Sequence, residues 1–134
     1  MSNQKTGALI VLTHKHELEE PMQTGIFMDA EISSQLIESI FYKENPLHDG
    51  AIIIHGNRIV AARCILPVSK RTDFPAIYGL RHRAALGITE QTDASAIIVS
   101  EQTGQIAYAR RGKLTSNLKA EVLKSILEKE YKNA

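Results

Sequence analysis

Short runs of consecutive apolar residues recur along the chain and are separated by turn-forming residues. Unbroken apolar runs of this length are typical of strands buried on both faces of a sheet. Two of the runs are each followed by a short turn and a second extended run, which predicts two antiparallel hairpins. The predicted strands span residues 7–13, 51–54, 58–66, 95–99 and 105–109, and residues 25–32 form a further short extended segment.

Apolar residues spaced three and four positions apart predict two amphipathic helices. The first runs from an N-cap at Ser33 or Ser34 to about Tyr42. The second, at about residues 117–131, follows a cap within the Thr-Ser-Asn triplet at 115–117 and carries lysines in its last turns, where the helix dipole favours cations. The apolar positions are Leu36, Ile37, Ile40 and Phe41 in the first helix and Leu118, Val122, Ile126 and Leu127 in the second.

A third helix is predicted between the two hairpins, at about residues 81–88, and its Gly87 allows another segment to pack closely against it. A long loop at residues 67–80 precedes this helix, and long loops that end in a charged motif are usually functional. Residues 17–23 are charged and contain a proline, so they are predicted to form a surface loop. Residues 110–113 are predicted to form a solvated basic turn.

The order of these elements predicts an α/β fold, in which one domain has a mixed central β-sheet flanked by helices. The hairpins require antiparallel neighbours, so a doubly wound parallel sheet is excluded. The 134 residues suit a single domain with a core of ordinary size. We expect this domain to span residues 1–134, with its core at about 7–112 before the C-terminal helix.

Composition limits which kinds of partner the chain could bind and which cellular compartment it suits. The formal net charge is +1, so nothing attracts the whole chain to a nucleic acid polymer or an anionic membrane, and any basic site is local. Cys64 is the single cysteine, which favours a reducing compartment, and its apolar neighbours indicate a buried strand residue rather than a nucleophile. No transmembrane run or signal peptide is visible, and the polar residues 1–5 fit the cut end of a longer protein.

The first candidate for chemistry is the stretch Leu80-Arg81-His82-Arg83, which follows Gly79 and opens the third predicted helix. Free N–H groups and the helix dipole favour an anion at a helix start, and arginines can grip a phosphate bidentately. Two plainer interpretations stay open. The arginines also suit a solvated helix start, and His82 also suits a structural role that orients the loop.

The second candidate is the stretch Leu47-His48-Asp49-Gly50-Ala51, about thirty residues upstream. It sets an imidazole beside a carboxylate, followed by a glycine that lets the backbone approach a ligand closely. Taken alone, Asp49-Gly50 also fits an ordinary turn that starts a strand. We expect the two stretches to meet in space around a nucleotide triphosphate.

Three other sets of polar residues have weaker functional interpretations. His14 and His16 share a strand face and could form a metal pair, although a solvated strand end is the favoured interpretation. Arg63 either reaches a carboxylate across the sheet edge or, as we favour, points to solvent. The pair Lys70-Arg71 is predicted to be a solvated loop tip rather than a ligand-binding group.

Several motifs together resemble the diadenylate cyclase domain. They are Pro46 to Ala51 with its Asp-Gly-Ala triplet, Ile65-Leu66-Pro67, Gly79 to Ala85 with its Arg-His-Arg triplet, and Val99-Ser100-Glu101. The resemblance covers residues 7–112 and is greatest for the membrane-anchored members of the family. It implies a nucleotidyltransferase that condenses two ATP into cyclic di-AMP, a second messenger, and releases two pyrophosphates. It also implies a divalent metal cofactor, either Mg, Mn or Co.

The resemblance assigns a role to each matching residue. Asp49 orients or deprotonates the attacking ribose 3′-hydroxyl, and an ordinary carboxyl pKa of about 3.9 makes orientation and metal binding the better role. Leu66 contacts adenine through its main chain, and Gly50 and Ala51 lie against ribose and phosphates. The full predicted sets are Asp49, Arg81, His82 and Arg83 as catalytic; Gly50, Ala51, Leu66, Gly79, Leu80, Ser100, Glu101 and Gln102 as substrate-binding; and His48, Asp49 and Glu101 as metal ligands.

Three positions depart from the family pattern. Leu80 replaces a common threonine, Gln102 replaces a common glutamate, and Ile65 stands where some relatives have an aromatic residue. These changes motivate an alternative function, a degenerate cyclase fold that senses ATP or a cyclic dinucleotide without turnover. A third hypothesis is a plain interaction domain that docks through its terminal helix.

A two-fold symmetric product made from two identical substrates implies a homodimer, transient or stable, in which two sites face each other. The family resemblance further implies regulatory partners, namely a membrane protein and a sugar-phosphate mutase. It also implies a cytoplasmic domain of a bacterial protein anchored in the plasma membrane.

Overall fold

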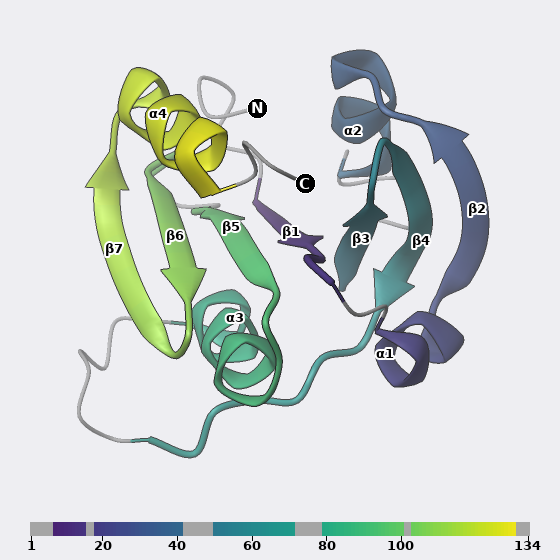
Figure 1. Cartoon of the computed structure of the whole chain (residues 1–134), viewed down its shortest axis with the longest axis horizontal. Helices are drawn as coiled ribbons and strands as arrows, with labels where there is room; N and C mark the ends of the chain where they lie inside the picture. Colours follow the sequence, from purple (N-terminus) through teal and green to yellow (C-terminus); the bar gives the residue numbers. More distant parts are fainter. Residues whose placement is uncertain (1–6, 16–17, 42–49, 72–78, 101–102, 131–134) are drawn as a thin grey trace.

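The computed structural model describes residues 7–15, 18–41, 50–71, 79–100 and 103–130. Seven strands form one twisted sheet, in the order β2-β4-β3-β1-β5-β6-β7 (Figure 1). The helices are α1 (Glu19–Thr24), α2 (Ser34–Ile40), α3 (Leu80–Gln91) and α4 (Ala120–Glu130). The strands are β1 (Ala8–Leu12), β2 (Ile26–Glu31), β3 (Ala51–His55), β4 (Arg58–Cys64), β5 (Ser95–Val99), β6 (Ile106–Arg110) and β7 (Lys113–Leu118).

The sheet is mixed, which confirms the predicted fold class. β1 pairs in parallel with β3, with Ile10 opposite Ile52, whereas every other neighbouring pair is antiparallel. Both predicted hairpins, β3–β4 and β5–β6, are present. The central strands are buried on both faces, as their unbroken apolar runs predicted.

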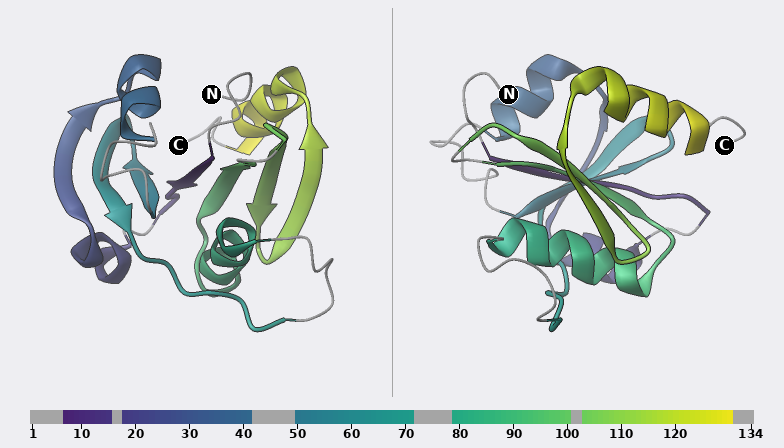
Figure 2. Two further views of the ribbon diagram at one scale, coloured as in Figure 1. Left: turned by 180° about the vertical axis from the view of Figure 1, so that it is seen from behind. Right: turned by 90° about the vertical axis from the view of Figure 1, so that its left-hand side faces the viewer.

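Helices cover both faces of the sheet, with α1 and α3 on one side and α2 and α4 on the other (Figure 2). Two hydrophobic clusters correspond to these faces. One gathers Leu18, Ala85 and Ile88 around the strand residues beneath α1 and α3, and the other packs Ile40 and Phe41 of α2 onto the opposite face. The sheet is therefore the middle layer of the domain, with a hydrophobic cluster and a pair of helices on each face.

The predicted first helix is confirmed as α2, and its start has the predicted cap. Ser33 Oγ accepts a hydrogen bond from the Leu36 amide at 3.0 Å, which satisfies one free donor of the first turn. The helix between the hairpins is also confirmed, but α3 extends to Gln91, beyond the predicted end near residue 88.

The prediction of a surface loop at residues 17–23 was wrong over the part that the structure describes. Glu19–Thr24 is the helix α1, and Pro21 lies in its first turn, where no amide hydrogen is required. Leu18 and Met22, four residues apart, pack against the core and hold this short helix on the sheet.

The prediction of a helix cap at residues 115–117 was also wrong. Residues 113–118 form β7, a seventh strand at the edge of the sheet that pairs with β6. Asn117 has a left-handed backbone (φ 59°) near the end of this strand, and α4 begins only at Ala120. None of the apolar residues of α4 is fully buried. The spacing of these residues correctly predicted a helix, but the helix does not pack deeply into the core.

A polar network ties the end of α4 to the sheet. The Arg110 guanidinium lies 3.1 Å from the Glu130 carboxylate, so the prediction of a solvated turn was wrong for this arginine. The Tyr108 hydroxyl contacts the same carboxylate and lies 2.7 Å from Ser95 Oγ. His14 Nε2 lies 3.4 Å from the same serine oxygen, which places His14 within this network, while His16 lies outside the described residues.

Candidate active site

Four strand ends meet at one edge of the sheet. Because β1 is parallel to β3 and antiparallel to β5, the starts of β1 and β3 lie beside the end of β5. The pair Ala51 and Cys64 brings the end of β4 to the same edge. Three of the predicted motif residues flank these strand ends: Gly50 precedes β3, Leu66 follows β4 and Ser100 follows β5. The sheet topology therefore gathers stretches that are far apart in the sequence.

The start of α3 reaches this edge through Arg81. A β-carbon added to Gly7, just before β1, would lie only 2.7 Å from Cζ of Arg81, so the guanidinium lies directly over the backbone there. Arg81 and Leu80 also line a pocket of about 210 Å³ with Gly50. The two predicted stretches therefore do meet in space, in that part of each that the structure describes. The remaining lining residues are Leu9, Cys64, Ile65, Leu66, Val68 and Ala84.

Gly50 permits the close approach of β3 and β4 at the site. Its φ is +99°, and an added β-carbon would lie 2.8 Å from the Cys64 carbonyl oxygen. Both the backbone angle and the lack of space exclude a side chain, so only glycine fits without a shift of β4. The glycine therefore lets β3 and β4 lie together at the point where Gly50 lines the pocket.

The Arg-His-Arg triplet occupies the first turn of α3, as predicted. The Arg83 amide donates to the Gly79 carbonyl oxygen at 3.2 Å, and the Arg83 guanidinium donates to the Arg71 carbonyl oxygen at 3.4 Å. All three side chains are half-buried, so the triplet is part of the packed structure and also reaches the surface.

Burial lowers the pKa of the His82 imidazole below 6.5, and the neighbouring Arg81 guanidinium lowers it further. His82 is therefore neutral at physiological pH and can both donate and accept a hydrogen bond. Burial also lowers the pKa of His14, with a second contribution from Arg110.

These two shifts predict an acid-sensitive fold. Since both imidazoles resist protonation in the folded state, the unfolded chain binds more protons below about pH 6.5, and the free energy of unfolding falls as the pH is lowered through that value. Denaturant unfolding at about pH 7.5 and about pH 5.5 measures the decrease. The variants His14→Gln and His82→Gln should each show a smaller decrease in the free energy of unfolding than the natural chain. A decrease in both variants as large as that of the natural chain would contradict the assignment.

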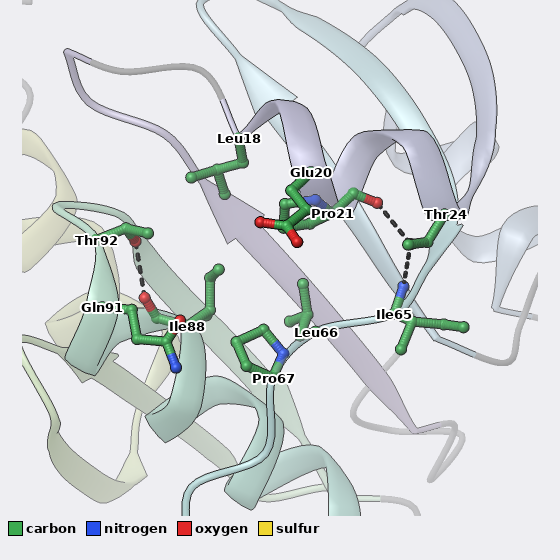
Figure 3. Close-up of a pocket in the computed structure, with 10 residues that line it drawn as sticks. All are labelled: Leu18, Glu20, Pro21, Thr24, Ile65, Leu66, Pro67, Ile88, Gln91 and Thr92. Atoms are coloured by element: carbon green, nitrogen blue, oxygen red, sulfur yellow. Dashed lines mark hydrogen bonds between the residues drawn. The ribbon is translucent and has the colours of Figure 1, made fainter.

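A second pocket, of about 470 Å³, adjoins the first and is large enough for a nucleobase (Figure 3). It lies between α1 and α3, with the segment after β4 as its wall. Thr24 fixes this wall, because its hydroxyl accepts a hydrogen bond from the Ile65 amide at 2.8 Å and donates to the Pro21 carbonyl oxygen at 2.6 Å. The pocket is lined by Leu18, Glu20, Pro21, Thr24, Ile65, Leu66, Pro67, Ile88, Gln91 and Thr92.

Most of this lining was missed by the sequence-based prediction, which named only the Ile65-Leu66-Pro67 motif. Leu66 lines both pockets and is 6% exposed, whereas the Ile65 side chain stands at their rim and is 70% exposed. The missed residues belong to α1 and to the second half of α3. The spacing of Leu18 and Met22 was the available signal for α1, although Pro21 obscured it.

Other predicted site residues do not line these pockets or lie outside the described residues. Ala51 is buried in β3, Gly79 precedes α3, and Ser100 follows β5, where its Oγ accepts a hydrogen bond from the Thr103 amide at 3.3 Å. Within the described ranges, no cluster of three metal-ligating side chains is present. The predicted residues outside those ranges are His48, Asp49, Glu101 and Gln102.

The remaining basic candidates differ from each other. Arg63 is exposed, in agreement with the favoured interpretation, and its left-handed backbone (φ 56°) sits at a bulge in β4 beside Gly50. Arg71 is exposed, as predicted for a solvated loop tip, but its guanidinium also lies 3.4 Å from the Glu90 carboxylate and contacts the Gly112 carbonyl oxygen, which the sequence did not predict.

The chain was compared with known families and proteins. The family described as "DisA bacterial checkpoint controller nucleotide-binding" matches residues 1–114. The cyclic di-AMP synthase CdaA of Bacillus subtilis is 43% identical over 98% of this chain and 48% of its own length. A diadenylate cyclase of Listeria monocytogenes is 45% identical over 97% of this chain and 48% of its own length. The chain thus spans about half the length of these curated relatives.

Solved structures agree with this relationship. A double mutant of DacA from Staphylococcus aureus superposes with a TM-score of 0.94 at 42% identity, covering 96% of this chain and 86% of that one. A protein of Bacillus cereus described as membrane spanning superposes with a TM-score of 0.84 at 45% identity, covering 88% of this chain and 58% of that one. The sequence match, the shared fold and the meeting of the two motif stretches lead to one conclusion: the chain belongs to the DisA-type family of diadenylate cyclase domains.

Proposed function

We propose that this domain is a diadenylate cyclase that condenses two ATP molecules into cyclic di-AMP and releases two pyrophosphates. The observation that carries the proposal is the convergence of Gly50, Leu66 and Arg81 on one pocket beside a nucleobase-sized pocket. Relatives named as diadenylate cyclases or cyclic di-AMP synthases support the same reaction.

The two pockets suit the two halves of the substrate. Adenine enters the pocket between α1 and α3, which has both apolar and polar lining residues, and Leu66 contacts it through its main chain. The triphosphate then extends over Gly50 toward Arg81, which lines the same pocket. Arg83 is not among the lining residues and is proposed to reach the phosphates from beside the pocket, so that both guanidiniums offset the negative charge. His82 is neutral and orients this first turn of α3. Leu80, which is 76% exposed, supplies no side-chain donor, so the helix N–H groups serve the phosphates.

Each half-reaction forms a bond from a ribose 3′-oxygen to the α-phosphorus of the other ATP and breaks the bond from that phosphorus to the pyrophosphate oxygen. Asp49, which precedes Gly50 in the sequence, orients the attacking hydroxyl. Two such attacks close the ring, so two subunits face each other, each with one ATP, in a transient or stable homodimer.

A divalent cation suits the proposed donors His48, Asp49 and Glu101, because carboxylates bind Mg²⁺ or Mn²⁺ and an imidazole favours Mn²⁺ or Co²⁺. Within the described residues the site offers the Ser100 hydroxyl and no carboxylate cluster, so the fit depends on these three residues. When bound, the cation neutralises phosphate charge and increases the acidity of the 3′-hydroxyl.

The regulatory membrane protein and sugar-phosphate mutase suggested by the family resemblance remain proposed partners, as does a cytoplasmic position beneath a bacterial plasma membrane. The B. cereus relative is described as membrane spanning, which supports an anchored parent protein. None of the helices in the described part of the chain combines the length and apolar character needed to cross a bilayer.

A second candidate function is an ATP or cyclic-dinucleotide sensor without turnover, favoured by the exposed Leu80 at the pocket and by Gln102. Incubation with ATP and a divalent metal separates the two functions. A cyclase forms cyclic di-AMP, whereas a sensor binds the nucleotide and leaves ATP intact.

A further inference from the structure

The segment after β4, residues 67–71, lies along the outer side of α3 and connects the two pockets. The Ser69 amide donates to the Arg83 carbonyl oxygen at 2.9 Å, which pairs the segment with the catalytic end of the helix. A β-carbon added to Gly87 would overlap the Pro67 carbonyl and lie 3.0 Å from the Ser69 amide nitrogen, so the two backbones are in direct contact. Pro67 itself is part of the wall of the base pocket.

Arg71 fastens the far end of this segment. Its guanidinium lies 3.4 Å from the Glu90 carboxylate of α3 and contacts the Gly112 carbonyl oxygen in the turn between β6 and β7. The same Glu90 oxygen accepts a hydrogen bond from the buried Ser69 hydroxyl at 2.9 Å, and that hydroxyl oxygen accepts one from the Arg71 amide at 3.3 Å. One arginine therefore joins the loop, the helix and the edge of the sheet.

This arrangement also involves Arg83. The guanidinium of Arg83 donates to the Arg71 carbonyl oxygen at 3.4 Å, so the backbone that the Arg71 side chain fixes is the same backbone that holds the Arg83 side chain. An exposed ion pair alone adds little to folding stability. A side chain that bridges three elements next to a proposed phosphate-binding arginine has a larger effect on orientation.

We infer that Arg71, together with Glu90, is a positioning residue that sets the orientation of Arg83 toward the triphosphate. The inference rests on the proposed cyclase function, and it deepens that function by adding a pair outside both pockets. If residues 67–71 become more mobile, the Arg83 guanidinium still attracts the phosphates, but it adopts the orientation needed for reaction less often. Loss of Arg71 should consequently act on kcat more than on the KM for ATP, because misplacement by about 1 Å is costly mainly for the reacting geometry.

The test compares Arg71→Ala with Lys70→Ala, which removes the same charge from an exposed neighbour. We expect Arg71→Ala to lower kcat about tenfold and to change the KM for ATP less than about threefold. We expect Lys70→Ala to keep the natural values. Glu90→Ala should lower kcat in the same direction, and the loss in the double variant should be clearly smaller than the two single losses combined, since both remove the Arg71–Glu90 contact. Arg71→Lys should restore part of the loss, because its ammonium can still reach Glu90.

Equal losses in Arg71→Ala and Lys70→Ala, or additive losses in the double variant, would overturn the inference. Hydrogen exchange of the Ser69 amide distinguishes a failure of this inference from a failure of the proposed cyclase function. If the natural chain forms no product, the cyclase proposal fails, while the inference still requires faster exchange of the Ser69 amide in Arg71→Ala than in Lys70→Ala. Unchanged Ser69 exchange would overturn it whether or not the chain is active.

Discussion

The variant Asp49→Asn should lose at least about 99% of the cyclase activity and keep its affinity for ATP. Asparagine has nearly the shape of aspartate but carries no charge, so it binds a divalent metal more weakly and cannot accept the hydroxyl proton. The proposed contacts of adenine with Leu66 and of the phosphates with Arg81 use other residues, so nucleotide binding should persist. Product formation by mass spectrometry and ATP binding by calorimetry measure the two quantities separately.

Asp29→Asn is the matched control for this variant. Asp29 lies on the edge strand β2 with a left-handed backbone (φ 51°), a conformation that asparagine tolerates equally well. It loses an exposed ion pair with Arg58, whose nitrogen lies 3.0 Å from the carboxylate, and such pairs contribute little. The control should keep full activity. Substantial activity in Asp49→Asn would contradict the role proposed for Asp49.

The variant Gly87→Ala should destabilise the domain, although alanine normally stabilises a helix interior by about 0.5–1 kcal/mol over glycine. At this position the added methyl group would overlap the Pro67 carbonyl oxygen and lie 2.6 Å from the Pro67 carbonyl carbon. Both atoms belong to the backbone, so neither can turn aside as a flexible side chain would. Overpacking of this kind costs about 1–3 kcal/mol, so it outweighs the gain in helix propensity. Thermal unfolding should show a melting temperature lower by about 5 °C or more.

Gly79→Ala supplies the comparison, because an added β-carbon at that N-cap meets no atom of the described residues within 4 Å. Its melting temperature should differ from that of the natural chain by only about a degree or two. Gly87→Ala should also weaken ATP binding, since Pro67 forms part of the wall of the base pocket. A Gly87→Ala variant as stable as the natural chain would show that the segment after β4 is free to move away.

The sequence predicted the central strands and both hairpins because their apolar runs are buried on both faces and the turns between them are distinct. It failed at the periphery. The strand β7 has an exposed, mostly polar sequence and exists because β6 offers it an open edge, which is a tertiary effect. The helix α1 is only six residues long and depends on the contacts of Leu18 and Met22 with the core.

The site was predictable in part for a similar reason. The motif residues carry a recognisable chemistry, and this chemistry led to the expectation that the stretches with Gly50 and Arg81 meet, as they do in one pocket. Contacts that depend on packing left no such pattern. Neither the position of Arg81 over Gly7 nor the bridge from Arg71 to Glu90 and Gly112 can be read from spacing, because each joins residues from separate elements.

The central claim is tested most directly by incubating the natural chain with ATP and Mg²⁺, Mn²⁺ or Co²⁺ and identifying the products by mass spectrometry. We predict cyclic di-AMP and pyrophosphate in a ratio of about one to two, with a rate per protein that falls on dilution because two subunits must meet. Intact ATP with every metal, together with demonstrable ATP binding, would contradict the cyclase proposal and favour the nucleotide sensor.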